Sequence, residues 1–302
     1  MTDLDPAKLA GSEDRRQIAL LHTAPGLKGS GRLRYGAAMH LHARGLLPDQ
    51  ALELYRIVSP HDGDDPSALL AENGLLDSVP PVGIVTATDR ISILLAEADA
   101  YLAGLQATGI NAVRRRLARW RNGSVVPATA CTNKVVARYL PAALDQVALR
   151  HPALASAIAA GAPHLSWITY DGYKRQEIGP DFLAGHAYSS LIGENACIAA
   201  TDFDFGIFLI APHVLYRDHM HRAPELYAPL TGPHGWRFGP GSKLKIKQAD
   251  VPIWNPSYAP HLTKAGPVPF LCFFGWTKNV GEAATVIAAD DWQMLEALRL
   301  ID

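Results

Sequence analysis

Residues 216–232 read YRDHMHRAPELYAPLTG and hold two histidines, a glutamate, two tyrosines and a glycine. On a β-strand, positions i and i+2 point to the same face, so the rings of His219 and His221 can address one point. Glu225 follows the short polar link RAP, where a hairpin would bring its carboxylate back beside the two rings. Two imidazoles and a carboxylate suit a divalent ion such as zinc or iron. The alternative is a polar barrel rim that binds no metal.

This stretch lies in the second of two parts with different hydrophobic periods. In the first part, residues 88–109 show the clearest helical spacing. Their shared apolar face consists of Ile91, Leu94, Leu95, Ala98, Leu102 and Leu105. Thr88 is the expected N-cap of this helix, and Gly109 lies just past its expected end. After Phe182 the pattern changes to short apolar runs such as FGIFLIAP (205–212), which Gly, Pro and Asn separate as in an antiparallel barrel or sandwich.

The two periods predict an α+β protein with a helical N-terminal region, residues 1–180, and a C-terminal antiparallel β-barrel, residues 181–302. Single sequences place boundaries poorly, so the change of period is assigned only to a range, between about residues 165 and 190. No long Gly/Ser or charged tether separates the halves, so we expect the helices to pack as a layer on the barrel. Residues 290–300, DDWQMLEALRL, predict a short closing helix.

Composition narrows the class of protein. Of 302 residues, 48% are apolar and 19% charged, which is typical of a globular domain, and the net charge of −1 favours neither nucleic acid nor a membrane as partner. The first residues are polar and lack a signal peptide's apolar core, so we expect a cytoplasmic protein. Cys131, Cys197 and Cys272 are expected to be buried reduced thiols. The basic stretch RRRLARWR (114–121) indicates a solvated or salt-bridged helix face more than a nucleic-acid site.

The spacing of the opening stretch resembles the cupin family. The first cupin motif ends HxH(x)3–4E(x)6G, and this chain has His219-x-His221, Glu225 and Gly232 at those intervals. The second motif contains PxG(x)2H, which residues 256–261 match with Tyr258 in place of glycine. The chain also departs from the pattern at His213, where the first motif has glycine, and it lacks the closing asparagine of the second. The resemblance implies a barrel whose metal ligands are His219, His221, Glu225 and His261.

The flanking residues resemble one group of cupins, the dimethylsulfoniopropionate (DMSP) lyases. Their signature Y-x-x-H-x-H-x-x-x-E-x-Y is filled from Tyr216 to Tyr227, and the likeness spans roughly residues 165–280. It implies a carbon–sulfur lyase that cleaves DMSP into dimethyl sulfide and acrylate by β-elimination, with a tyrosine as the base. The implied cofactor is one divalent metal ion, for which zinc, iron, manganese and nickel all suit the ligand set.

The resemblance makes Tyr216 and Tyr227 the candidate catalytic bases. Tyr227 shares the face of Glu225, whereas Tyr216 stands an odd three residues before His219 and needs a bulge or twist to face the same side. The alternative for each tyrosine is a packing role with a hydrogen-bonded hydroxyl.

Three further residues are expected to contact the substrate. Lys264 stands where these lyases more often have arginine and would pair with the substrate carboxylate, whereas aromatic rings attract a sulfonium cation. The expected substrate-binding residues are Lys264, Trp276 and Tyr188.

Two other functions remain open from the sequence. Three histidines and a glutamate also serve iron-dependent cupin dioxygenases, and a cupin can act as a non-catalytic small-ligand binding protein. The expected partner is a small-molecule substrate. For the helical half, covering the barrel mouth and forming a homodimer are both open.

Overall fold

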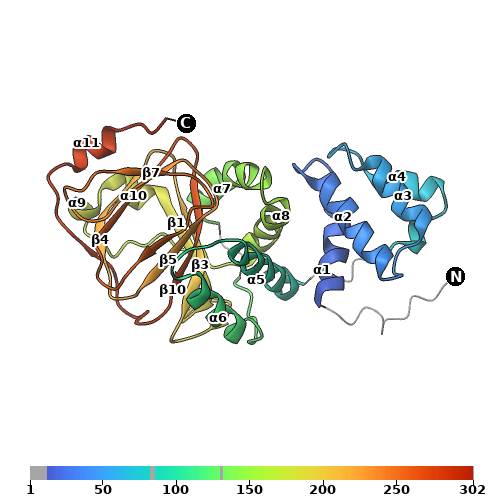
Figure 1. Cartoon of the computed structure of the whole chain (residues 1–302), viewed down its shortest axis with the longest axis horizontal. Helices are drawn as coiled ribbons and strands as arrows, with labels where there is room; N and C mark the ends of the chain where they lie inside the picture. Colours follow the sequence, from blue (N-terminus) through green and yellow to red (C-terminus); the bar gives the residue numbers. More distant parts are fainter. Residues whose placement is uncertain (1–11, 82–85, 130–131, 302) are drawn as a thin grey trace.

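A computed structural model describes residues 12–81, 86–129 and 132–301. Helices make up the first part of the chain, and two facing β-sheets make up the second, with the first strand beginning at His186 (Figure 1). This confirms the predicted fold class, a helical N-terminal half followed by a cupin-type antiparallel β-structure. The two sheets do not close into a continuous barrel, and a β-sandwich describes them better. The division at residues 180 and 181 stays a prediction.

The sandwich consists of a six-stranded and a five-stranded sheet. The first has the order β2-β1-β3-β10-β5-β8, and the second the order β11-β4-β9-β6-β7. Within the described residues, every strand pairing is antiparallel except that of β1 with β2. The strands of the first sheet are β1 (His186–Gly193), β2 (Ile198–Ala199), β3 (Asp204–Ile210), β5 (Glu225–Pro229), β8 (Ile253–Asn255) and β10 (Phe270–Trp276). Those of the second are β4 (Leu215–Met220), β6 (His234–Arg237), β7 (Lys245–Lys247), β9 (His261–Ala265) and β11 (Thr285–Val286).

Side chains of the six-stranded sheet alternate between two apolar cores. On β3, Phe205 and Leu209 belong to the core that the helices share, whereas Phe208 and Ile210 face the interior of the sandwich. Trp236 of the five-stranded sheet closes that interior from the other side. Alternate residues of a strand therefore face either the helices or the interior of the sandwich.

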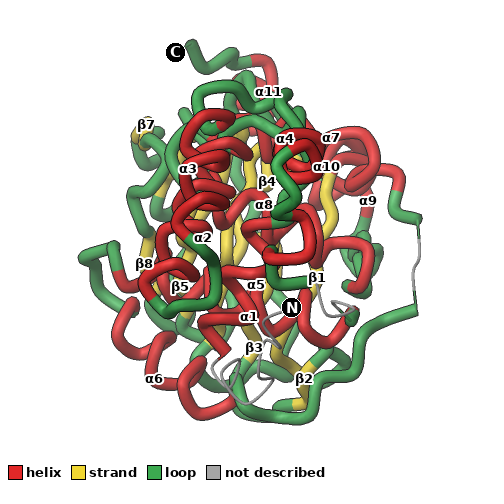
Figure 2. Tube along the Cα trace, turned by 90° about the vertical axis from the view of Figure 1, so that its right-hand side faces the viewer, coloured by secondary structure: helices red, strands yellow, loops and turns green. Residues whose placement is uncertain are grey.

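Four helices cover the outer face of the six-stranded sheet. They share one continuous core with its strands, and seen from the right of Figure 1 helices stand in front of the strands (Figure 2). These helices are α5 (Ala87–Ala103), α6 (Ile110–Trp120), α7 (Lys134–Ala148) and α8 (Pro152–Gly161), with the short helix η3 (Ala162–His164) after them. The expected packing of a helical layer against the β-structure is found for this part of the chain.

The first helices form a separate lobe and do not join that layer. They surround their own apolar core, which includes Leu21, Leu41, Tyr55 and Leu70, and they lie beyond α5 and α8 in Figure 1. Since they bury their apolar faces against each other, little apolar surface remains for the sheet. The expectation of one helical layer was therefore wrong for these elements, which are α1 (Ser12–Leu21), α2 (Ser30–Ala43), α3 (Asp49–Val58), α4 (Pro66–Glu72) and η2 (Leu76–Ser78).

Helix α5 begins and ends earlier than the sequence pattern indicated. Its N-cap is Thr86, whose hydroxyl accepts a hydrogen bond from the Asp89 amide at 3.2 Å, while the Asp89 carboxylate accepts one from the Thr86 amide at 3.0 Å. Gly109 is the N-cap of α6, where its φ of 89° favours glycine. The predicted apolar face is nevertheless buried from Ile91 to Leu102.

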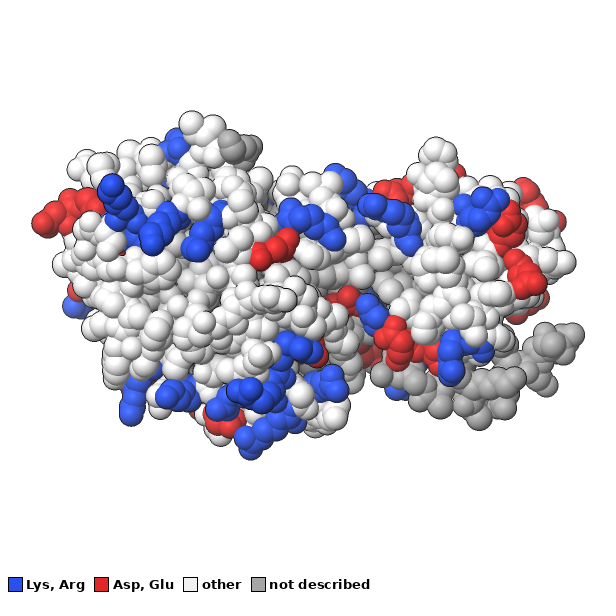
Figure 3. All heavy atoms as spheres, viewed as in Figure 1, with Lys and Arg blue, Asp and Glu red and all other residues white. Residues whose placement is uncertain are grey.

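The arginines of α6 are largely paired with carboxylates. Lys and Arg gather over α6 in Figure 3, yet Arg116 and Arg119 each donate to Asp202 at 3.1 Å, and Arg114 donates to Asp99 at 2.8 Å. Because Asp202 lies between β2 and β3, its two contacts join α6 to the sheet, whereas the contact with Asp99 joins α6 to α5. This arrangement agrees with a salt-bridged helix face.

Short helices flank the sandwich. They are α9 (Arg175–Ile178) and α10 (Pro180–Gly185) before β1, and the expected closing helix, α11 (Trp292–Ala297). Cys197 and Cys272 are buried and free, as expected, whereas Cys131 lies outside the described residues. In the described ranges, no helix combines the length and apolar character that crossing a membrane requires.

Candidate active site and metal centre

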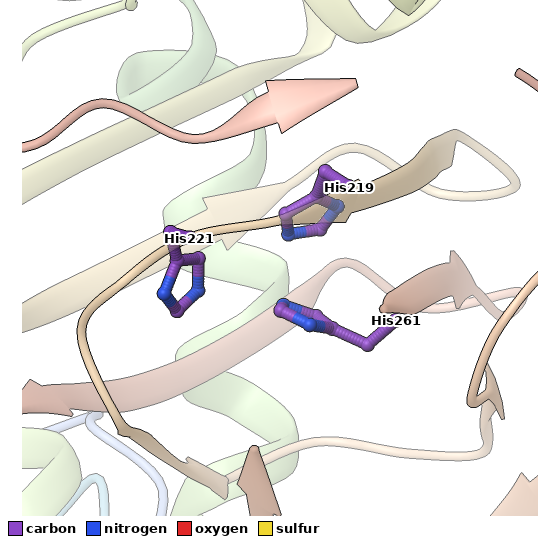
Figure 4. Close-up of side chains that lie close together, drawn as sticks. All are labelled: His219, His221 and His261. Atoms are coloured by element: carbon purple, nitrogen blue, oxygen red, sulfur yellow. The ribbon is translucent and has the colours of Figure 1, made fainter. Parts of the chain in front are cut away.

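Three histidines meet in the interior between the two sheets. His219 lies on β4, His221 just beyond the end of that strand, and His261 at the start of β9. Their ligating nitrogens all lie within 4.8 Å of one another, and all three side chains are buried. Figure 4 shows the rings turned toward one another, with His219 and His261 on neighbouring strands, where the two residues are direct register partners.

Backbone carbonyls fix the orientation of each ring. Because a carbonyl oxygen only accepts, the Nδ1 of each ring carries a proton. The Nε2 atoms of His219 and His261 are buried and have no hydrogen-bond partner among the described residues. The Nδ1 atoms of His219, His221 and His261 donate to the carbonyls of Arg217, Ala223 and Ala259, at 2.8, 2.7 and 2.9 Å.

Glu225 reaches the cluster from the opposite sheet. Its Oε2 lies 3.0 Å from His221 Nε2 and 3.5 Å from His261 Nε2, and its Oε1 accepts a hydrogen bond from Trp276 Nε1 at 2.7 Å. The expected hairpin is wrong, because β4 and β5 belong to different sheets and the link between them crosses the sandwich. The carboxylate still arrives beside the rings, since Glu225 opens β5 with its side chain facing inward.

The charge state of the cluster fits a cation. Burial, with the neighbouring His261 and His221, lowers the pKa of His219 well below its ordinary value, so this ring is neutral. Burial opposes ionisation of Glu225, but His221 and His261 outweigh it and hold the pKa of the carboxyl below its usual range. Burial opposes protonation of His221, but Glu225, 3.0 Å from its Nε2, raises the pKa of this ring above its ordinary value. A metal ion would take the place of that proton, since histidine ligands typically bind through one ring nitrogen and donate from the other to a carbonyl. Together with the carboxylate, they fit a divalent zinc, iron, manganese or nickel ion.

A bulge in β4 turns Tyr216 toward the cluster. The register of β4 with β9 shifts between Tyr216 and His219, so both residues face inward although three positions separate them. The Tyr216 ring stacks on His219 with centroids 3.8 Å apart and on Phe182 at 4.1 Å. Its hydroxyl is hydrogen-bonded to the Tyr173 hydroxyl at 2.7 Å. The bulge that the sequence required for this tyrosine is therefore present.

Tyr227 reaches the same interior from β5. It lies two positions after Glu225 on the same face, and its ring centroid is 6.4 Å from that of His261 and 5.0 Å from that of Trp236. Burial, followed by the charge of Glu225, raises the pKa of Tyr227 well above 10. Burial also raises the pKa of Tyr216 well above 10, with Tyr173 as the next cause.

A cavity of about 440 Å³ opens beside the cluster. Glu225 and both tyrosines line it, and so do Tyr188 and Trp276, two of the three residues expected to bind substrate. The Trp276 ring also stacks on His221 with centroids 4.6 Å apart. Five further aromatic residues line the cavity, namely Tyr170, Tyr173, Phe182, Phe208 and Phe274. A small cationic ligand would meet ring faces there.

Lys264 does not belong to the cavity. It stands an odd three positions after His261 on β9, so its side chain faces the other side of the strand. Its ammonium donates to the carbonyl of His213 at 2.5 Å and to that of Glu296 at 3.0 Å. The expectation that Lys264 contacts the substrate was therefore wrong.

Both departures from the cupin glycines keep the backbone of a glycine. His213 and Tyr258 stand where the motifs have glycine, and they adopt φ values of 63° and 59° in the left-handed region. The conformation is thus retained at some cost in strain. Gly232, which the motif retains, packs so closely that a β-carbon would lie 2.5 Å from the Ala249 amide nitrogen.

Sequence reasoning did not predict the contacts that two polar residues make at the site. Tyr173 bonds Tyr216, and Asp204, the first residue of β3, lines the cavity. Tyr173 comes from an irregular loop with no periodic signal. Asp204 had one visible signal, since it is a lone carboxylate directly before the apolar run FGIFLIAP. The residues that lie beside it in space depend on the strand register, which one sequence does not reveal.

Two facing antiparallel sheets with a buried histidine cluster able to hold a metal ion define a protein of the cupin type. The model of the dimethylsulfoniopropionate lyase family matches residues 109–272, more than half of the sequence, and the chain belongs to this family.

Individual proteins are also similar to this chain. The dimethylsulfoniopropionate lyase DddQ of Ruegeria pomeroyi is 29% identical over 138 residues, which are 43% of this chain and 62% of that protein, so the chain matches less than two thirds of the relative's length. One of the crystal structures of the DMSP lyases RdDddP and RnDddQII has the same fold, with a TM-score of 0.51 and 18% identity over 67% of this chain and 100% of that one. The crystal structure of DddQ from Ruegeria pomeroyi aligns with a TM-score of 0.48 and 24% identity over 65% of this chain and 95% of that one.

Proposed function

We propose that this protein cleaves DMSP into dimethyl sulfide and acrylate by β-elimination in a metal-dependent reaction. The observation that carries the proposal is the convergence of three buried imidazoles whose Nδ1 atoms are tied to carbonyls, beside a carboxylate and two tyrosines that line one cavity. Membership of the DMSP lyase family supports the same substrate and reaction.

His219, His221, Glu225 and His261 are the proposed metal ligands. A divalent ion bound there would supply positive charge that attracts the substrate carboxylate and offsets the negative charge developing on it as the α-proton leaves. The four side chains come from two sheets, so the packing of the sandwich sets their separation. Because all four are buried, the surrounding protein excludes water and strengthens each electrostatic contact.

Tyr227 is the proposed base. In the ligand-free protein its pKa is raised by burial, so the hydroxyl keeps its proton. A cation nearby favours the tyrosinate and works in the opposite direction. Tyr216 is the second candidate, and its hydrogen bond with Tyr173 offers a neighbouring hydroxyl to share its proton.

The elimination needs no further reagent. The base takes the proton from the α-carbon, the electron pair of that C–H bond forms the double bond of acrylate, and the β-carbon–sulfur bond breaks. Sulfur leaves with the electron pair of the broken bond as neutral dimethyl sulfide. The aromatic wall of the cavity, including Tyr188 and Trp276, would hold the sulfonium before departure.

The proposal is tested by adding DMSP to metal-loaded protein and measuring dimethyl sulfide in the headspace together with oxygen uptake. The lyase predicts dimethyl sulfide without oxygen consumption. Oxygen uptake without dimethyl sulfide would assign the site to a dioxygenase. Thermal stabilisation by DMSP without any product would assign it to a binding protein.

A further inference from the structure

The charge of the cavity wall is one-sided. Four carboxylates line the cavity, whereas none of its described lining residues is a lysine or an arginine. Glu225 belongs to the histidine cluster, and Glu282 is about half exposed and paired with Arg222 at 2.5 Å. Glu194 is exposed. Asp204 is the remaining carboxylate, and the metal centre does not involve it.

Asp204 lies across the sheet from the metal centre. It is the register partner of Trp276 on β10, and Trp276 is the partner of Glu225 on β5. Directly opposed residues share a face, so all three side chains point into the sandwich. Two strand spacings of about 4.8 Å place the α-carbons of Asp204 and Glu225 roughly 10 Å apart. This span accommodates a short acid whose carboxylate lies at the metal centre and whose other end lies near Asp204.

The Asp204 carboxylate has no cationic partner among the residues that the structure describes. Its Oδ1 is buried and has no hydrogen-bond partner among the described residues. Gly193 lies close to the same oxygen, since a β-carbon on it would come within 3.0 Å of Oδ1. Burial raises the pKa of Asp204 to about 6. A hydrogen bond with Ser190 acts in the opposite direction, and the charge of Glu225 adds a smaller increase. The carboxyl group is therefore mostly ionised at neutral pH. Asp204 is partly buried as a whole, and a carboxylate withdrawn from water without a cationic partner is costly to stability unless a ligand offsets its charge.

Aromatic rings surround the same end of the cavity. Tyr188 and Phe274 meet edge to face with centroids 6.3 Å apart, and both line the cavity with Trp276 and Asp204. Burial raises the pKa of Tyr188, and the charge of Asp204 is the next cause. Ring faces together with one carboxylate recognise a poorly hydrated cation, such as a sulfonium or quaternary ammonium, and not a second anion.

We propose that Asp204 is the counter-ion of the substrate's sulfonium group and makes the cavity selective for acids that carry a positively charged group on the β-carbon. This inference rests on the proposed function for the identity of the substrate. It concerns charge selectivity alone, and binding without turnover is sufficient to measure it. Asp204 acts at the opposite end of the substrate from the metal centre.

The test compares two unreactive acids of the same shape, 3-(trimethylammonio)propionate and its neutral carbon analogue 4,4-dimethylpentanoate. Binding of each to metal-loaded protein is measured by calorimetry. We expect the unmodified protein to prefer the cationic acid. Asp204→Asn should weaken binding of that acid by roughly tenfold or more, as losing a charged contact does, and leave the neutral acid unaffected. Glu282→Gln, a cavity carboxylate that already has a partner, is the matched control and should change neither affinity.

Thermal unfolding of the same variants adds a second measurement. If Asp204 is kept for the ligand, Asp204→Asn removes a partly buried charge that has no cationic partner, and it should raise the unfolding midpoint of the ligand-free protein. Equal loss of affinity for both acids, an equal effect of Glu282→Gln, or a destabilised Asp204→Asn protein would overturn the proposal. Failure of the lyase function is a separate result. If Asp204→Asn abolishes the preference for the cationic acid and the unmodified protein releases no dimethyl sulfide from DMSP, the cation site stands and the proposed reaction is wrong.

Discussion

Two tyrosines reach the cavity by different routes, and their kinetic roles can be separated. Tyr227 follows the period of β5, whereas Tyr216 depends on the bulge in β4 and is fixed by stacking and by Tyr173. Phenylalanine at either position removes only the hydroxyl and leaves the ring in place.

Tyr227→Phe should lower the rate of dimethyl sulfide release by about 10²–10⁴-fold, the usual effect of losing a general base. Metal content should remain near that of the unmodified protein, because the four proposed ligands are unchanged. Tyr216→Phe should cause the smaller loss. Turnover near the unmodified rate in both variants, with metal bound, would rule out a tyrosine base.

Lys264→Met tests the corrected position of that lysine. Since the ammonium bonds two carbonyls outside the cavity, the KM for DMSP should not change. Burial lowers the pKa of Lys264 to about 8. Between pH 8 and about 10.4 the unfolded chain holds a proton that the folded chain has released, so this group makes stability rise with pH. Urea unfolding across this pH range should show a smaller rise of the free energy of unfolding in the variant than in the unmodified protein. A raised KM for DMSP in the variant would show that Lys264 does contact the substrate.

At the scale of elements, α11 holds the bulge of β4 from outside. Asp218, within the bulge and fully buried, accepts hydrogen bonds from Arg237 on β6 and, at 2.8 Å, from the Trp292 indole of α11. Arg237 also bonds Asp291, at the N-terminus of that helix. This network ties the closing helix to the strand that carries Tyr216.

Asp218→Asn should therefore lower the free energy of unfolding by about 3–5 kcal/mol, because the buried Arg237 loses its anionic partner. Asp202→Asn is the control. Asp202 is about two-fifths exposed and pairs with α6 arginines, so its loss should cost no more than about 1 kcal/mol. Urea denaturation measures both variants, and similar losses in the two would show that the Asp218 network carries no special weight.

The sequence predicted which side chains lie together in the sandwich better than it predicted the connections around them, and the roles of those side chains stay predictions. Local spacing was sufficient for His219, His221, Glu225 and Tyr227, since strand period and motif intervals act within a few residues. The sheet change between β4 and β5, the outward face of Lys264 and the inward face of Asp204 depend on pairings between distant strands. A single sequence does not contain the register of those pairings.

For the whole molecule, the position of the site predicts which parts activity requires. All proposed ligands and bases come from the sandwich, and α1 to α4 form a lobe with its own core. A chain beginning at residue 86 should keep metal binding and dimethyl sulfide release. A chain beginning at residue 185 should fail to fold, because it exposes the sheet face that α5 to α8 cover. Circular dichroism and product release check both chains, and full activity of the shorter one would contradict the role of the helical layer.

The central claim, that the buried cluster binds the ion on which elimination depends, is tested most directly by titrating a divalent metal into metal-free protein while dimethyl sulfide release from DMSP is recorded. We predict no release at the start, a rate that rises with bound metal, and saturation at one ion per chain. Full release from metal-free protein, or saturation without any product, would contradict the account.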